Sequence, residues 1–114
     1  MTNEKKAAIA FIVALSRRNG ISAVYDYSRN KYCSYTSSGS RNQIQIFDYD
    51  RHNFIGGLLP NVYDYASNSY INLNVRNNTF SGFDYETSQF FSGTICDTMV
   101  SLYSNGQYSN YTIL

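Results

Sequence analysis

The chain has 114 residues and a formal net charge of +1, from nine basic and eight acidic residues, which gives no electrostatic basis for binding nucleic acid or an anionic membrane. Its length predicts one domain, residues 1–114, able to bury roughly 65% of its unfolded surface. With 12 Tyr, seven Phe, no Trp and one Pro, the composition is typical of a β-protein with polar turns and excludes a disordered or collagen-like chain.

Residues 3–18 are predicted to form a helix. Thr2 or Asn3 can cap its N-terminus, and Gly20 can supply the left-handed residue at its exit. The centre of this helix, residues 7–15, is apolar on every side, so the helix must be covered nearly all round. A curved sheet would provide that cover.

The same segment has an alternative interpretation as a signal peptide, with Lys5 and Lys6 as the basic end and residues 7–15 as the apolar core. Arg17 and Arg18 stand where a small-residue cleavage site would be expected, which favours the core helix. Nine apolar residues are also too few to span a bilayer.

The two cysteines set no disulfide framework. Cys33 falls among the aliphatic positions, as a small buried residue would, and Cys96 lies beside a turn; the sequence leaves open whether they pair. Because small secreted domains are usually dense in disulfides, a reduced cytoplasmic protein is the favoured prediction, with secretion as the alternative.

From residue 21 onward the sequence predicts about ten short strands joined as an antiparallel meander. Glycines within these strands, at positions 56, 57, 82 and 93, are predicted to mark bulges or strong bends. The predicted fold class is α+β, with one N-terminal helix packed against a curved antiparallel sheet over residues 21–113. The predicted strands are 21–28, 31–37, 43–50, 53–59, 61–66, 69–76, 79–86, 89–96, 99–104 and 107–113, and turn-forming residues at 38–42, 60–61, 77–78 and 97–98 join four pairs of them.

An eight-residue pattern recurs along the predicted sheet: an aromatic residue, Asp, Tyr, four linking residues and a second aromatic residue. A fifth, decayed copy at residues 101–108 contains Asn105-Gly106, the strongest short signal for a two-residue hairpin turn. That turn would place Tyr103 opposite Tyr108, and the same register elsewhere would pair the motif Tyr with the last aromatic residue. The full copies are residues 25–32, 47–54, 63–70 and 83–90, with predicted pairs Tyr27–Tyr32, Tyr49–Phe54, Tyr65–Tyr70 and Tyr85–Phe90.

Alternation along each strand places the motif Asp residues and an aliphatic set on one face and the aromatic residues on the other. We expect the aliphatic face to cover the helix, although periodicity also allows the opposite arrangement and does not choose between an open sheet and a closed barrel. An exposed aromatic face would need a partner: a second copy, a ligand or another part of the chain. The aliphatic set is Val24, Cys33, Ile44, Ile46, Ile55, Val62, Ile71, Leu73, Val75, Phe91, Ile95, Val100, Leu102 and Ile113.

The residues able to support chemistry are few. Each motif Asp precedes a turn, where it can accept hydrogen bonds from turn N–H groups, and four carboxylates on different hairpins are not expected to converge on a metal. His52 is predicted to be an exposed turn residue. Asp48 and Asp50 share a face, as a glycosidase acid–base pair would, yet paired carboxylates at hairpin ends are common. No phosphate-binding loop, nucleophile motif or Cys/His metal spacing occurs, so no cofactor or metal is predicted.

Residues 47–54, Phe-Asp-Tyr-Asp-Arg-His-Asn-Phe, resemble one unit of the tyrosine–aspartate hairpin repeats of large bacterial toxin shells. As a whole, the short chain rich in Tyr, Asn and Ser resembles orphan proteins of unknown function carried on bacterial mobile gene cassettes of the integron type. That resemblance implies a bacterial source and a capacity for self-assembly, and it implies no site residues.

The sequence therefore favours a non-enzymatic binding or adaptor module that self-associates through its aromatic face, as a homodimer or a higher homo-oligomer. The alternatives are a carbohydrate- or small-ligand-binding module and a small enzyme using His52, Asp50 and a Tyr. The residues predicted for the ligand or oligomer face are Tyr27, Tyr49, Tyr65, Tyr70, Tyr85 and Tyr103.

Overall fold

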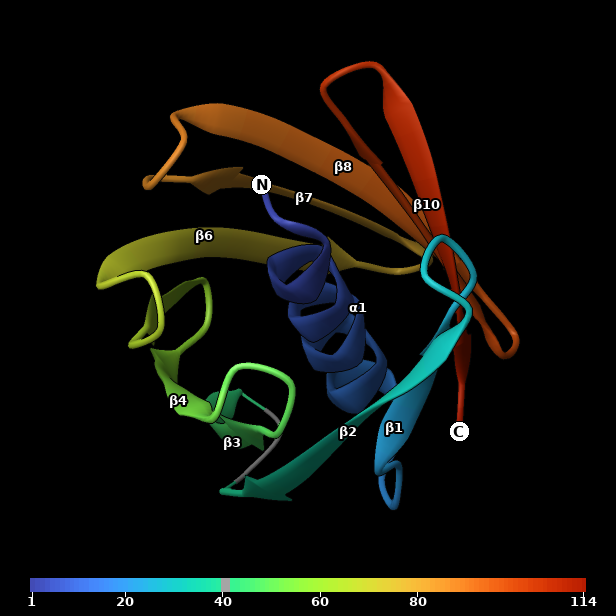
Figure 1. The fold of residues 1–114 in the computed structure, drawn as a ribbon, viewed down its shortest axis with the longest axis horizontal. Helices are drawn as coiled ribbons and strands as arrows, with labels where there is room; N and C mark the ends of the chain where they lie inside the picture. Colours follow the sequence, from blue (N-terminus) through green and yellow to red (C-terminus); the bar gives the residue numbers. More distant parts are fainter. Residues whose placement is uncertain (40–41) are drawn as a thin grey trace.

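The computed structural model describes residues 1–39 and 42–114, and it consists of one helix inside a closed antiparallel barrel (Figure 1). The predicted α+β class and meander are confirmed, and β1 pairs with β10 to close the sheet, which the sequence left undecided. The predicted turn at 38–42 includes residues 40 and 41, which lie outside the described residues. The elements are α1 Asn3–Arg17, β1 Ala23–Asp26, β2 Lys31–Ser38, β3 Gln43–Asp48, β4 Asn53–Leu58, β5 Asn61–Asp64, β6 Ser69–Arg76, β7 Thr79–Asp84, β8 Gln89–Cys96, β9 Met99–Ser104 and β10 Gln107–Ile113.

Helix α1 fills the barrel because it is apolar on every side. Eight consecutive residues, 7–14, have no exposed surface, and the ring of Phe11 stacks on that of Tyr35 in β2, with 4.4 Å between centroids. The hydroxyl of Thr2 accepts a hydrogen bond from the backbone N–H of Lys5, as predicted for the N-cap. Since burying a large aliphatic side chain contributes roughly 1.5–3 kcal/mol, contact with the sheet rather than intrinsic propensity holds the helix.

The inner surface of the barrel is the predicted aliphatic face. All members of the aliphatic set are buried except Val75, which is partly buried against the core. The aromatic residues of the repeats lie outside, so the arrangement with the helix on the aromatic face is excluded. This choice follows from burial, because the wide apolar surface of α1 is best covered by the face whose side chains are predominantly aliphatic.

The predicted hairpin register is correct for the decayed copy and wrong for the four full copies. Tyr103 lies opposite Tyr108 across the two-residue turn, as predicted. In the first full copy, however, Tyr25 lies opposite Tyr32 and Asp26 opposite Lys31, and the other three copies pair in the same way. Their loops have four residues rather than two, so the preceding strands end at the motif Asp. The last residue of each loop has positive φ, between 51° and 56°; these residues are Asn30, His52, Asn68 and Ser88.

The strand glycines do not mark bulges. Pairing continues through Gly56, Gly82 and Gly93 without an extra residue on either strand. A Cβ on Gly82 would clash with the carbonyl oxygen of Asn72, and one on Gly93 would clash with that of Ser101. These two glycines therefore mark places where neighbouring backbones and inward Phe rings approach closely.

Both cysteines are free, so they do not pair. Cys33 is buried inside the barrel, as expected, and Cys96 is exposed outside it. Over residues 1–39 and 42–114, no helix has both the length and the apolar character needed to cross a membrane.

Candidate functional site

Every full copy of the repeat places three aromatic rings on the outside of the barrel. The first ring packs edge-on against the ring opposite it across the hairpin and against the motif Tyr, with centroids 4.7–5.0 Å apart and ring planes at 65–77°. Such pairs contribute roughly 0.5–1.5 kcal/mol each beyond burial. We call these groups the aromatic clusters: Tyr25–Tyr27–Tyr32, Phe47–Tyr49–Phe54, Tyr63–Tyr65–Tyr70, Phe83–Tyr85–Phe90 and, in the decayed copy, Tyr103–Tyr108.

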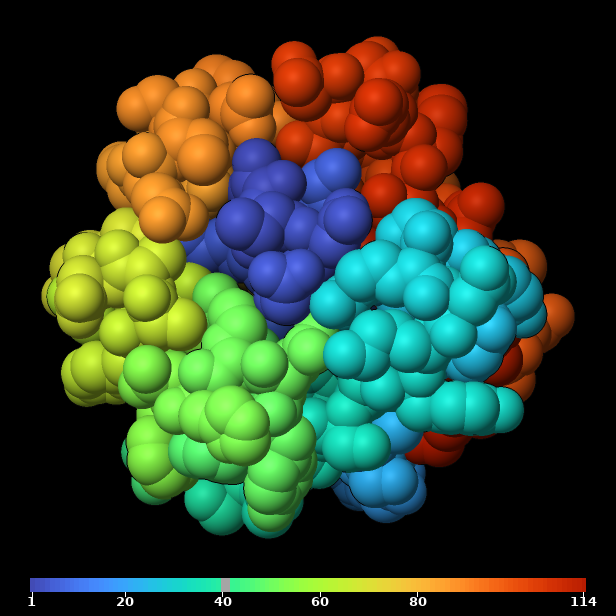
Figure 2. All heavy atoms as spheres, in the orientation of Figure 1, coloured from blue at the N-terminus to red at the C-terminus, as the bar shows by residue number. Residues whose placement is uncertain are grey.

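The outer rings of the clusters are accessible to solvent, with exposed fractions from 40% for Tyr103 to 78% for Phe90. Figure 2 shows the repeat turns as lobes arranged around the N-terminal end of α1. Because the barrel is closed, the clusters are spread around it rather than gathered on one flat face. The six residues predicted for the ligand or oligomer face are all exposed: Tyr27, Tyr49, Tyr65, Tyr70, Tyr85 and Tyr103.

The outer surface of β6 to β10 is hollowed beside two of these clusters. Two adjoining hollows of about 630 and 530 Å³ share Asn74, Ser81, Ser92 and Tyr103 in their linings. We call the combined hollow the serine groove. Its further outward-facing lining residues are Asn72, Phe83 and Phe90 towards the repeat turns, Tyr108 beside Tyr103, and Arg76, Thr79, Thr94 and Ser101 towards the opposite end of the barrel.

Strand register produces the serine groove. Asn74 lies opposite Ser81, Ser81 opposite Ser92, and Ser92 opposite Tyr103, so three short polar side chains form a floor that ends at an aromatic ring. The side-chain amide of Asn74 donates to the side-chain oxygen Oδ1 of Asn72 at 2.9 Å, which fixes the orientation of two side-chain amides beside that floor. Short side chains create the hollow, and the Phe and Tyr rings at one end form its wall.

A second hollow, of about 580 Å³, lies over β3 to β5. Its floor is Gly56, which faces outward and leaves space between Phe54, Leu58 and Tyr65. Leu58 is 65% exposed, and the half-exposed rings of Phe54 and Tyr65 line the same hollow.

The motif Asp residues are braces for the turns, as predicted, and they are fully buried. Asp84 accepts hydrogen bonds from the N–H of Glu86 and the hydroxyl of Thr87, which are turn groups two and three residues later. Burial alone would raise the pKa of Asp84, but hydrogen bonds from Lys5 and Thr87 and the charge of Lys5 lower it below its ordinary value. The other three motif Asp residues accept equivalent bonds in their own turns.

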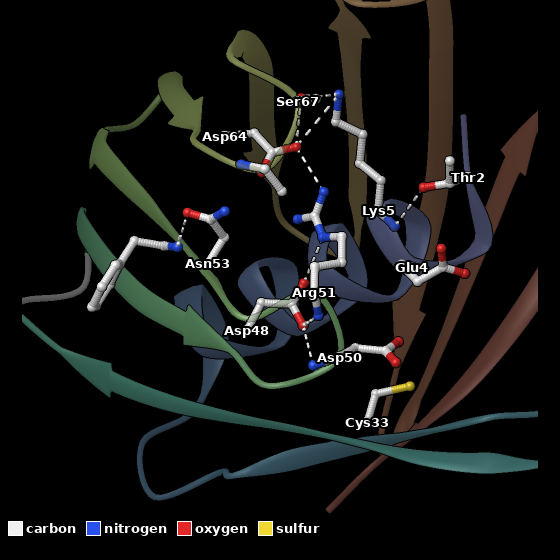
Figure 3. Close-up of polar contacts among 12 residues, drawn as sticks. Thr2, Glu4, Lys5, Cys33, Asp48, Asp50, Arg51, Asn53, Asp64 and Ser67 are labelled. Carbon is white, nitrogen blue, oxygen red and sulfur yellow. Dashed lines mark hydrogen bonds and ion pairs between the residues drawn. The ribbon is translucent and has the colours of Figure 1, made fainter.

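Lys5 connects these braces to the helix. Lys5 lies in the first turn of α1. Its ammonium is 2.6 Å from Asp84 Oδ1, 3.1 Å from Glu86 Oε1 and 3.6 Å from Asp64 Oδ2. The Arg51 guanidinium bridges the carboxylates of Asp64 and Asp48 at 2.8 Å each (Figure 3). Charges from the helix and from successive turns thus pair in a buried network, which holds the N-terminal end of α1 in the barrel.

The candidate catalytic residues are not assembled into an acid–base site. Asp48 is buried and paired with Arg51, and Asp50 accepts from Arg29 at 2.8 Å and Lys31 at 2.9 Å. Burial would raise the pKa of Asp50, but the hydrogen bonds and charges of Lys31 and Arg29 lower it. His52 is exposed on its turn, as predicted, at a positive-φ position. Among the described residues, no group of three or more His, Cys, Asp or Glu side chains could hold a metal ion.

Sequence reasoning found the aromatic rings but missed the serine groove. Ser81, Ser92 and Asn74 belong to three strands, and their alignment depends on the pairing of β6, β7 and β8. The available signal was the outward position of short polar residues on consecutive strands beside Gly82 and Gly93.

The chain matches no protein-family model, no curated protein and no solved structure.

Proposed function

We propose that the protein is a non-enzymatic carbohydrate-binding module whose ligand lies in the serine groove. The observation that carries this proposal is the combination, in one elongated hollow, of a hydroxyl and amide floor with an aromatic wall. Sugars present the same two kinds of surface, since their hydroxyl groups form hydrogen bonds and their C–H faces pack on aromatic rings. Ligand sites in general combine apolar walls with a few well-placed polar groups.

The closed barrel supports a preformed site. The floor residues are on strands whose inner faces pack on the core, and Gly82 and Gly93 allow Phe91 and Phe80 to pack beneath them. A site on rigid strands loses little conformational entropy when a ligand binds. A bound ligand would also cover the apolar rings of the wall. Burying apolar surface away from water lowers the free energy of binding by roughly 25 cal/mol per Å².

The proposal is tested by NMR titration of the protein with a panel of neutral and acidic oligosaccharides of two to four sugar units. We expect chemical-shift changes in the amides of Ser81, Ser92 and Tyr103. The double variant Phe90→Ser/Tyr103→Ser should bind the best ligand at least roughly tenfold more weakly, equivalent to about 1.4 kcal/mol.

The matched control is Tyr27→Ser/Tyr32→Ser, which removes two exposed rings from a cluster away from the groove. This control should bind as tightly as the unmodified protein. The proposal fails if no oligosaccharide shifts these amides, or if the control loses as much affinity as the groove variant.

Self-association is a second candidate function, favoured by the exposed apolar side chains of Phe54, Leu58 and Tyr65, which line one hollow. A second copy could cover Leu58 and the adjoining rings, as an interface core does in homodimers. Light scattering across a hundredfold concentration range should then give a mass near twice 13.0 kDa, and Leu58→Ser should restore the monomer mass. A monomer at every concentration would exclude this role.

A further inference from the structure

We infer that the ligand of the serine groove is an acidic oligosaccharide, with a sugar carboxylate paired to Arg76; this inference rests on the proposed carbohydrate-binding function. Arg76 is the last residue of β6, is exposed, and lines the groove at the end away from the repeat turns. Among the described residues that line the groove, it is the only one with a charged side chain.

The guanidinium of Arg76 is available to a ligand. Among the described residues it forms neither a salt bridge nor a hydrogen bond, whereas Arg29 and Arg51 are each committed to two carboxylates or more. A free guanidinium presents paired N–H donors that match the two oxygens of a carboxylate. An uncharged sugar would leave that capacity unused.

Charge is distributed along the barrel axis in a way that favours this orientation. Seven of the eight acidic residues belong to the repeat turns, the strand ends that precede them or the first turn of α1, and only Asp97 lies in a turn at the opposite end. Arg76 shares that opposite end with the end of the helix, where Arg17 donates to the Asn78 side chain. The acidic residues of the repeat-turn end are paired with basic residues there, so the unpaired positive charge that would attract a carboxylate lies at the opposite end of the groove, at Arg76.

The dimensions of the groove fit a short chain of sugars. Asn72, beside the aromatic wall, and Arg76 are four residue steps apart on one strand, a span of roughly 13 Å at about 3.3 Å per step. Arg76 lies opposite Thr79, Thr79 opposite Thr94, and Thr94 opposite Ser101, so a row of hydroxyl-bearing residues crosses the strands from the Arg76 position. One sugar ring can pack on Tyr103 or Phe90 while another brings its carboxylate to Arg76.

The test compares oligogalacturonates and oligoglucuronates of two to four units with their methyl esters, which keep the length but lose the charge. By calorimetry at low salt, we expect at least one acid to bind roughly tenfold or more tightly than its ester, as a charge-assisted hydrogen-bonded pair would give. Arg76→Gln should reduce the affinity for the acid to that for the ester. Arg18→Gln, an equal change in net charge outside the groove, should keep the preference.

The outcomes separate the inference from the function on which it rests. If neutral oligosaccharides bind in the groove and the acids bind no better than the esters, or if Arg76→Gln keeps the preference, the inference is overturned and the carbohydrate-binding function stands. If no saccharide of either kind binds, both are overturned. Loss of the preference in Arg18→Gln as well would show an effect of overall charge, which also overturns the role of Arg76.

Discussion

Replacing Lys5 by Met tests whether the buried charge network holds the helix in the barrel. The ammonium of Lys5 has no exposed surface, and it lies 2.6 Å from Asp84 Oδ1. Met has a similar length and apolar stem, so the variant removes mainly the charge and its hydrogen bonds. Asp84 would keep only the Glu86 N–H and the Thr87 hydroxyl as partners. A buried carboxylate that loses its cation costs about 3–5 kcal/mol.

That cost is a large part of the stability of a chain of this size, which is on the order of 10 kcal/mol. With a urea dependence of about 2 kcal/mol per molar, the unfolding midpoint should fall by roughly 2 M. The assay is urea unfolding followed by tyrosine fluorescence and by circular dichroism. Lys31→Met is the control, because the ammonium of Lys31 pairs with Asp50 at the surface; its midpoint should change little.

A fall in midpoint of less than about 0.3 M in Lys5→Met, or one no larger than in Lys31→Met, would refute the role of the network. The double variant Lys5→Met/Asp84→Asn refines the test. An amide in place of the carboxylate removes the uncompensated charge, so the double variant should lose less stability than the sum of the two single changes.

Two further predictions follow from the ionisation and burial of single groups. Because the pKa of Asp84 is lowered in the folded protein, the stability it contributes is present above pH about 4 and is lost as pH falls through the lowered pKa. The acid-unfolding midpoint of Lys5→Met should therefore lie at higher pH than that of the unmodified protein, and an unchanged midpoint would contradict this. Burial raises the pKa of the Cys33 thiol to about 11, so at pH 7.5 a thiol reagent should label exposed Cys96 rapidly and Cys33 only after unfolding. In the variant Cys96→Ser the remaining thiol is that of Cys33. Rapid labelling of this variant in its native state would contradict the prediction and show that the barrel opens readily.

The sequence determined the number and order of the secondary structure elements and the identity of the core, although the strands that precede the full-copy turns end two residues earlier than predicted. Period-two alternation assigned Ile46, Ile71 and Leu102 to one face, and the apolar segment around Phe11 required cover on all sides. The exposed rings were predictable for the same reason, since alternation is local and each strand reports its own two faces.

Hairpin register was predicted correctly only where the turn was encoded by Asn105-Gly106. In the full copies, the motif Asp accepts hydrogen bonds from groups two and three residues later, and this favours a four-residue loop ending in a positive-φ residue such as His52. These hydrogen bonds to the Asp side chain stabilise the longer loop. The two-residue turn of the decayed copy therefore does not occur in the full copies.

Tertiary structure alone decided that the sheet closes, that Lys5 meets Asp64 and Asp84, and that Ser81, Ser92 and Tyr103 line one groove. Each of these features joins residues from separate segments, through pairings that no local pattern specifies. Closure requires β1 to meet β10, about 90 residues apart, and it becomes favourable because the complete barrel covers every side of α1. The sequence of this protein encoded a two-faced sheet and a helix apolar all round; their mutual burial selected the barrel and placed the aromatic clusters and the groove on its outside.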